Sequence, residues 1–213
     1  MQAPTFRKSQ ISSLICAHRS KAYVRYQTIG AGASNPNKYR ENLFKQFGYL
    51  DSTSDLFAFV FAHSATLLKP GGRLAFVTSN SWLGSEYGLK LKRFFLQNFK
   101  IIAILESRCE PWFENARVNT VVTVLEKSPS FGTSESHFLH SDVTNHKAAF
   151  VKLRMPINEL ITNPLSDPTR FDKYLRLWAE IDQATDQSDD STMRIRKRRQ
   201  QSLFDDLMEG IPE

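Results

Sequence analysis

The amino-acid sequence predicts an α/β fold in which two parallel strands are followed by an antiparallel one. Residues 73–78 and 100–106 are short, almost uninterrupted apolar runs, the pattern of strands that helices cover on both faces. A helical pattern at 85–99 separates them, and strand, helix and strand in such close succession predict a right-handed parallel crossover. We therefore expect 73–78 and 100–106 to lie side by side and to run in the same direction.

A run rich in valine and threonine predicts the third strand. Residues 118–125 follow the second strand without room for another crossover helix. We expect this strand to lie antiparallel to its neighbour and to close the sheet by a hairpin-like return.

The strongest helix pattern precedes the first strand, at 51–72. Ser52 and Asp55 resemble a capping pair, and the segment Pro70-Gly71-Gly72 ends the helix. Apolar residues recur at helical spacing, and further phenylalanines between them predict burial on more than one side. Upstream, the sequence fits a short strand at 12–19, a loop at 30–36 and a basic, aromatic helix at 38–48.

The region after residue 127 is more polar. The pattern predicts a loop at 128–137, a strand and turn within 148–161, an amphipathic helix within 167–183, a polar linker near 184–192, and a basic run with a short amphipathic tail to 213.

Polar and aromatic side chains follow the first apolar strand, where Asn80 and Trp82 stand in the segment Ser-Asn-Ser-Trp. Open α/β sheets bind their ligands at the carboxyl ends of their strands, so this segment marks a candidate site. The alternative is a helix-capping loop in which Trp82 packs against the sheet.

Composition narrows the possible partners. The 213 residues carry a net charge of +6, which fits a polyanion partner or simply a soluble surface. The two cysteines, Cys16 and Cys109, have no metal-type spacing, and the clustered histidines lack the partners of a metal site, so no metal is expected. No apolar run reaches membrane-spanning length and the first 20 residues do not fit a signal peptide, which predicts a cytoplasmic protein without a membrane partner.

The order of four segments resembles the adenine-specific DNA methyltransferases of bacterial restriction-modification and related phage-defence systems. These segments are "LLKPGGRLAFVTSNSWL", "FFLQNF", "KIIAIL" and "VNTVVTVLEK", and "AYVRYQ" at 22–27 also fits. The first is common among S-adenosylmethionine-dependent methyltransferases, and it indicates fold more than substrate. The resemblance implies a partial Rossmann-like methyltransferase fold, S-adenosylmethionine as cofactor, double-stranded DNA as substrate and a bacterial or archaeal cytoplasm.

The resemblance also divides the chain, which matches the second half of the family's catalytic domain. It implies an atypical segment at 1–21, a partial catalytic domain at 22–127, the start of a target-recognition-like region at 128–185, and a charged linker with an amphipathic tail at 186–213. Too few residues precede Tyr23 for the family's cofactor loop, and Gly30 and Gly32 lie after the catalytic position. The partners implied are DNA and a missing methyltransferase half or a restriction subunit.

The family's catalytic Asn-Pro-Pro-Tyr is only partly present. Tyr23 matches the aromatic residue that stacks on the flipped base, whereas Ser20, Lys21 and Ala22 stand where Asn, Pro and Pro are expected. In the family, the Asn side chain and the first Pro carbonyl accept the hydrogens of the adenine amine. Because Ser20 has a shorter acceptor and the Pro-Pro turn is absent, we expect this chain alone to methylate poorly.

Other residues are candidates for DNA contact: Arg25, Asn80, Trp82, Asn119, Arg196 and Arg198. Asn119 is alternatively a turn residue, and the arginines are alternatively solvated charges. Two further functions stay open: a non-catalytic DNA-binding or partner-pairing relic of such an enzyme, and a methyltransferase for another nucleic acid or a small molecule.

Overall fold

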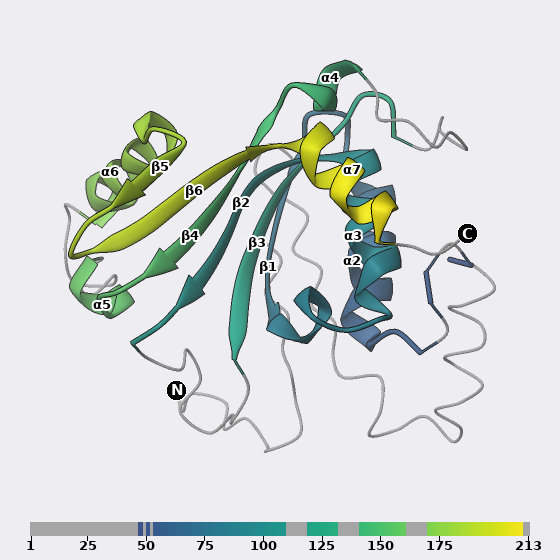
Figure 1. The fold of residues 1–213 in the computed structure, drawn as a ribbon, viewed down its shortest axis with the longest axis horizontal. Helices are drawn as coiled ribbons and strands as arrows, with labels where there is room; N and C mark the ends of the chain where they lie inside the picture. The colour runs from purple at the N-terminus through teal and green to yellow at the C-terminus, as the bar shows by residue number, and fades with distance from the viewer. Residues whose placement is uncertain are drawn as a thin grey trace, which may run out of the picture.

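The computed structural model describes residues 47–48, 50–51, 53–109, 119–131, 141–160 and 170–210, which form a mixed α/β fold (Figure 1). Its six-stranded sheet has the order β1-β3-β2-β4-β6-β5, and only the β2–β4 pair is parallel. The strands are β1 (Arg73–Ser79), β2 (Phe99–Ser107), β3 (Thr120–Lys127), β4 (Lys147–Leu153), β5 (Gln187–Asp189) and β6 (Met193–Arg199). The helices are α2 (Leu56–Leu67), η1 (Asn80–Leu83), α3 (Gly88–Asn98), α4 (Ser141–Thr144), α5 (Ile157–Leu160), α6 (Arg170–Gln183) and α7 (Gln200–Glu209).

The placement of β1 and β2 corrects one prediction. Both strands run antiparallel to β3 and therefore in the same direction, but β3 lies between them. A helix is about 10 Å across and neighbouring strands lie about 4.8 Å apart, so the α3 crossover leaves a gap one strand wide. The returning strand β3 fills this gap in the antiparallel direction that the sequence predicts, and its β-branched residues pair on both sides.

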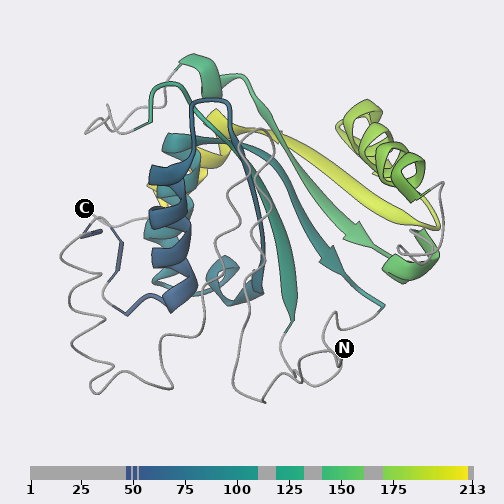
Figure 2. The same ribbon diagram turned by 180° about the vertical axis from the view of Figure 1, so that it is seen from behind.

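Helices cover both faces of this sheet. In both views α2, α3 and α7 stack on one side, and α6 lies on the other side beside β5 and β6 (Figures 1 and 2). The first core is rich in aromatic rings and includes Phe61, Phe76 and Phe95, whereas the second is aliphatic and includes Val151, Leu177 and Ile195. The apolar strands are therefore buried as expected for a sheet with two covered faces.

Helix α2 is buried over most of its surface, as its sequence predicts. Phe57, Phe59 and Phe61 are all buried, whereas Leu56 and Leu67 at the two ends are among the exposed apolar residues. Asp55 is the N-cap residue but makes no capping hydrogen bond, so the predicted capping role of its side chain is wrong; Ser52 lies outside the described residues.

A glycine turn connects α2 to the sheet. Gly71 has a φ of 72°, a backbone conformation in which any residue with a Cβ would be strained. Its N–H donates to the Lys127 carbonyl at 2.8 Å. In return, the buried Lys127 ammonium donates to the carbonyls of Ala65 and Leu68 at the end of α2, both at 2.8 Å. Burial lowers the pKa of this lysine. The side chain thus supplies donors to the last turn of the helix.

The C-terminal region differs from its prediction. The expected linker and basic run form the β5–β6 hairpin, which joins the sheet through β4, and the tail forms α7, which packs against α3. The reason is a two-residue alternation within the charged run: Met193 and Ile195 are buried while Arg196 is exposed. Among the described residues, no helix is long and apolar enough to cross a membrane.

Candidate functional site

The carboxyl end of β1 turns directly into η1, and this turn holds the polar residues that the sequence marks as a site. Ser79 caps η1, since its Oγ accepts a hydrogen bond from the Ser81 backbone N–H at 3.1 Å. The backbone N–H of Asn80 donates to the carbonyl of Asn119 at 2.9 Å, where β3 begins. The structure therefore brings together two of the predicted DNA-contacting residues, with Asn80 half-buried and Asn119 exposed.

Hydroxyl groups form a chain of hydrogen bonds beside this turn. Ser79 donates to Ser81 at 3.0 Å, the Ser81 and Tyr87 oxygens lie 2.8 Å apart, and Tyr87 donates to the Asp55 carboxylate at 3.0 Å. Burial raises the pKa of the Tyr87 phenol, and the hydrogen bond to Asp55 raises it further. The phenol is therefore a hydrogen-bond donor rather than a base at neutral pH, and the chain fixes η1 against the starts of α2 and α3.

Asp55 and Tyr87 are site residues that sequence reasoning missed. They lie 32 positions apart in the chain and meet only because α2 and α3 begin at the same edge of the sheet. The sequence signal available was that each of these polar residues stands directly before a helix. Helix capping alone is enough to explain a polar residue at such a position.

Trp82 lies in the core rather than on a DNA-accessible surface. Its side chain is 1% exposed and its ring meets Phe95 edge to face, with centroids 5.5 Å apart. A side chain this buried cannot stack on a base from this position. The predicted DNA contact of Trp82 does not fit this burial; the ring packs inside the core, as the alternative expects, with Phe95 of α3 as its aromatic neighbour.

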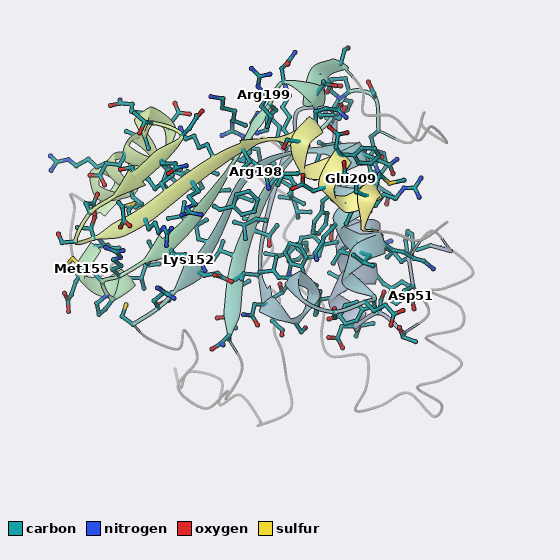
Figure 3. All side chains as sticks on the ribbon, in the orientation of Figure 1. Asp51, Lys152, Met155, Arg198, Arg199 and Glu209 are labelled. Carbon is teal, nitrogen blue, oxygen red and sulfur yellow. The ribbon has the colours of Figure 1, made fainter. Side chains whose placement is uncertain are left out.

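The two arginines of the basic run that the sequence marks as DNA contacts, Arg196 and Arg198, lie on β6, four strand positions from β1. Figure 3 shows Arg198 near the start of α7, where its guanidinium donates to Asp206 and Ser202, both at 2.8 Å. Arg196 is exposed and has no side-chain partner among the residues that the structure describes. Of the two, Arg196 is the one whose charge is available to an external phosphate.

The remaining predicted residues, Ser20, Tyr23 and Arg25, lie outside the described residues. The predicted absence of a metal concerns the whole chain; in the described part, no group of histidine, cysteine, aspartate or glutamate residues is arranged to hold an ion.

Comparisons with known proteins match parts of this chain. Residues 23–113 match the model of the Eco57I restriction-modification methylase family. The type II methyltransferase M.BanIII of Aneurinibacillus aneurinilyticus is 32% identical over 84 residues, which are 39% of this chain and 13% of that protein. The type IIG restriction endonuclease BpuSI has a similar fold, with a TM-score of 0.53 at 15% identity over 83% of this chain and 19% of that one.

The family match includes β1, η1, α3 and β2, whereas Asn119 and β3 lie beyond its end at residue 113. The chain spans a small part of each relative, 13% of the methyltransferase and 19% of the endonuclease. The chain thus resembles restriction-modification methyltransferases, as the order of its sequence segments predicts.

Proposed function

We propose that this chain is part of an adenine-specific DNA methyltransferase, one that moves a methyl group from S-adenosylmethionine to the exocyclic amine of adenine. The observation that carries the proposal is the polar turn Ser79–Asn80 at the carboxyl end of β1, within the 23–113 match to restriction-modification methylases. Such an edge is where α/β enzymes bind their ligands. The reversed strand β3, which joins two strands of common direction, is consistent with the proposed methyltransferase fold.

The described residues do not fit S-adenosylmethionine by themselves. In the turn after β1, the Ser79 hydroxyl bonds to Ser81, and Gly88 lies so close to η1 that a Cβ there would be 1.9 Å from the Trp82 carbonyl oxygen. Gly88 therefore packs against the η1 backbone, and no ligand fits between η1 and the start of α3. We therefore assign no cofactor contact to these residues, and binding depends on other parts of the methyltransferase.

Methyl transfer to adenine needs two aids, because the lone pair of the amine is delocalised into the ring. Tyr23 is the proposed stacking residue for the flipped base, a contact of about 1–3 kcal/mol. Ser20 stands where the family has the asparagine that accepts the amine hydrogens. With the shorter serine in that position the nitrogen is poorly oriented, and transfer by this chain alone is slow.

The catalytic part of the proposal is tested by single-turnover transfer of a labelled methyl group from S-adenosylmethionine to mixed-sequence duplex DNA. The chain alone is expected to label adenine slowly, and Tyr23→Ala to abolish this label while Tyr23→Phe retains it. Rapid transfer by the wild-type chain contradicts the impaired orientation. Label on cytosine contradicts adenine specificity.

Three of the four residues of the family's catalytic Asn-Pro-Pro-Tyr are replaced in this chain. This replacement favours a second candidate function, a non-catalytic DNA-binding or partner-pairing relic of such an enzyme. Calorimetry with S-adenosylmethionine separates the two candidates. Heat of binding supports a methyltransferase, and its absence together with retained duplex binding supports the relic.

DNA binding distinguishes Arg196 from Arg198, the two arginines of β6 proposed to contact DNA. Arg196→Gln is expected to weaken duplex binding and to reduce the slope of log K against log salt by about 0.9, the value for one lost phosphate contact. Arg198→Gln is expected to change the slope less, because Asp206 already holds its guanidinium at 2.8 Å. Fluorescence anisotropy of a labelled duplex between 50 and 200 mM salt, roughly the range over which phosphate contacts are resolved, measures both. Lys69→Gln, at an exposed site after α2, is the control.

An unchanged slope in Arg196→Gln would remove this arginine from the interface. A larger loss in Arg198→Gln than in Arg196→Gln would show that the ion pair with Asp206 opens on DNA.

A further inference from the structure

A cavity of about 600 Å³ lies between α6 and the sheet, at the end opposite the polar turn. Its walls include Arg73 and Glu126, which pair across β1 and β3, whereas Ser79 pairs with Thr120 at the other end of the same ladder. Six residues of strand span about 20 Å, so the cavity is separate from the candidate site. Its volume is in the range of small-molecule sites.

Cations from four different strands converge on this cavity: Arg73, Lys100, Lys147 and Lys197. Two carboxylates, Glu126 and Asp182, also line it, which leaves a positive excess on the walls. Such convergence is unlike a solvated charge run, in which neighbours on one element point into water.

Two of the four cations are occupied by short ion pairs. Arg73 Nε lies 2.9 Å from Glu126, and Lys147 Nζ lies 2.6 Å from Asp186. Lys100 is 3.8 Å from Glu126, a carboxylate that it shares with Arg73. Lys197 donates at 2.7 Å to the backbone carbonyl of Asp182, a neutral acceptor. Lys100 and Lys197 thus lack the short ion pairs that Arg73 and Lys147 make, and Lys197 interacts with the Asp186 carboxylate only at longer range.

An aromatic ring and an imidazole complete the lining. Trp178 on α6 is half-buried against the aliphatic core, and it presents an indole to the cavity. The Nε2–H of His146 donates to the Ile101 carbonyl at 3.0 Å, which leaves Nδ1 as an acceptor. Sites that bind nucleic acid combine cations, which attract the phosphate, with an aromatic ring, on which the attached base stacks.

We propose that this cavity binds a nucleotide, with the phosphate held by Lys100 and Lys197 and the base stacked on Trp178. The ligand is recognised by a phosphate joined to a base. Two kinds of molecule carry this group: a free nucleotide and the terminal nucleotide of a DNA end. This site is independent of methyl transfer, since its residues lie at the other end of the sheet.

The test uses the full chain and isothermal calorimetry with adenosine monophosphate, adenosine and a short 5′-phosphorylated duplex. Adenosine monophosphate is expected to bind with a 1:1 stoichiometry. Adenosine, which lacks the phosphate and so both lysine contacts, is expected to bind about 100-fold more weakly, at about tenfold for each charge-assisted contact. Lys100→Gln and Lys197→Gln each remove one of these contacts and are each expected to weaken binding of the phosphate-bearing ligand about tenfold. Lys69→Gln is the matched control, and thermal melts establish that each variant is folded.

The outcomes separate the source of the phosphate. Binding of the phosphorylated duplex without binding of the mononucleotide, when lost in both lysine variants, assigns the site to a DNA end. Quenching of tryptophan fluorescence that disappears in Trp178→Phe supports the stacked base. Equal affinity for adenosine and its monophosphate, or binding unaffected by both lysine substitutions, overturns the proposal, and neither result depends on methyl transfer.

Discussion

Substituting alanine for Gly88 is expected to lower the free energy of unfolding by about 3 kcal/mol, at the upper end of the cost of overpacking. A Cβ at this position would lie 1.9 Å from the Trp82 carbonyl oxygen and 2.7 Å from its carbon. Both atoms belong to the backbone of η1 and cannot move aside as a flexible side chain does. Helix propensity predicts the opposite sign, a gain of about 1 kcal/mol at the start of α3, so the two effects are distinguishable.

Gly84 is the matched control for this prediction, because it lies in the same turn. Alanine there meets nothing within 4 Å, and its φ of −116° is open to any residue. Gly84→Ala is expected to stay within about 0.5 kcal/mol of the wild type. Thermal melts measure both, and Gly88→Ala should lower the Tm by about 6–12 °C in a chain of this size. A Gly88→Ala protein as stable as Gly84→Ala would show that η1 does not pack against α3.

The consequence for the candidate site follows from the same contact. Tyr87 precedes Gly88, and its phenol connects Ser81 to Asp55. Displacing η1 breaks this chain of hydrogen bonds and moves Asn80. Gly88→Ala is therefore a variant in which stability and site geometry change together.

Local patterns predicted the strands and helices better than their arrangement. The apolar runs at β1 and β2 and the β-branched run at β3 correspond to observed strands, because burial on two faces selects such residues. The order β1-β3-β2 was not predictable from spacing. A crossover helix of the same length can place β2 directly beside β1 or one strand position away from it. The β5–β6 hairpin was missed because charged residues outnumber Met193 and Ile195 in its sequence.

The same limit applies to the candidate site. Asn80 and Asn119 were predicted separately, and only the register of β1 with β3 brings them together through a backbone hydrogen bond. Trp82 shows the converse. A tryptophan in a polar segment is compatible with exposure or burial, and the position of Phe95 on α3 decides for burial.

Replacing Gln200 by methionine is the second large effect that we expect, a loss of about 2–5 kcal/mol. Gln200 is fully buried at the start of α7. Its Oε1 accepts from the Ile101 backbone N–H at 2.7 Å, and its Nε2 donates to the Phe99 carbonyl at 3.0 Å. A further bond runs from Nε2 to the Leu96 carbonyl at 3.3 Å. Methionine keeps the volume of the side chain and removes all three hydrogen bonds, so these buried backbone groups lose the amide as their partner.

The topology explains why a side chain is needed there. Strand β2 begins at Phe99, but its ladder with β4 begins only at Ala103, after the irregularity that follows Ile101. The first residues of β2 therefore lack a strand on that side. The amide of Gln200 accepts from the Ile101 N–H and donates to the Phe99 and Leu96 carbonyls, and His146 meets the Ile101 carbonyl at 3.0 Å.

The adjacent Gln201 separates the effect of burial from that of the amide. Its Nε2 donates to Asp205 at 2.6 Å on the exposed side of α7, and Gln201→Met is expected to cost at most about 0.5 kcal/mol. Urea denaturation measures both free energies. Hydrogen exchange of the Ile101 amide provides the specific readout, since it should quicken in Gln200→Met beyond the global loss of stability. If that amide stays as protected as in the wild type, water or another group replaces the glutamine. In that case the start of β2 is held beside the start of α7 by packing rather than by the Gln200 amide.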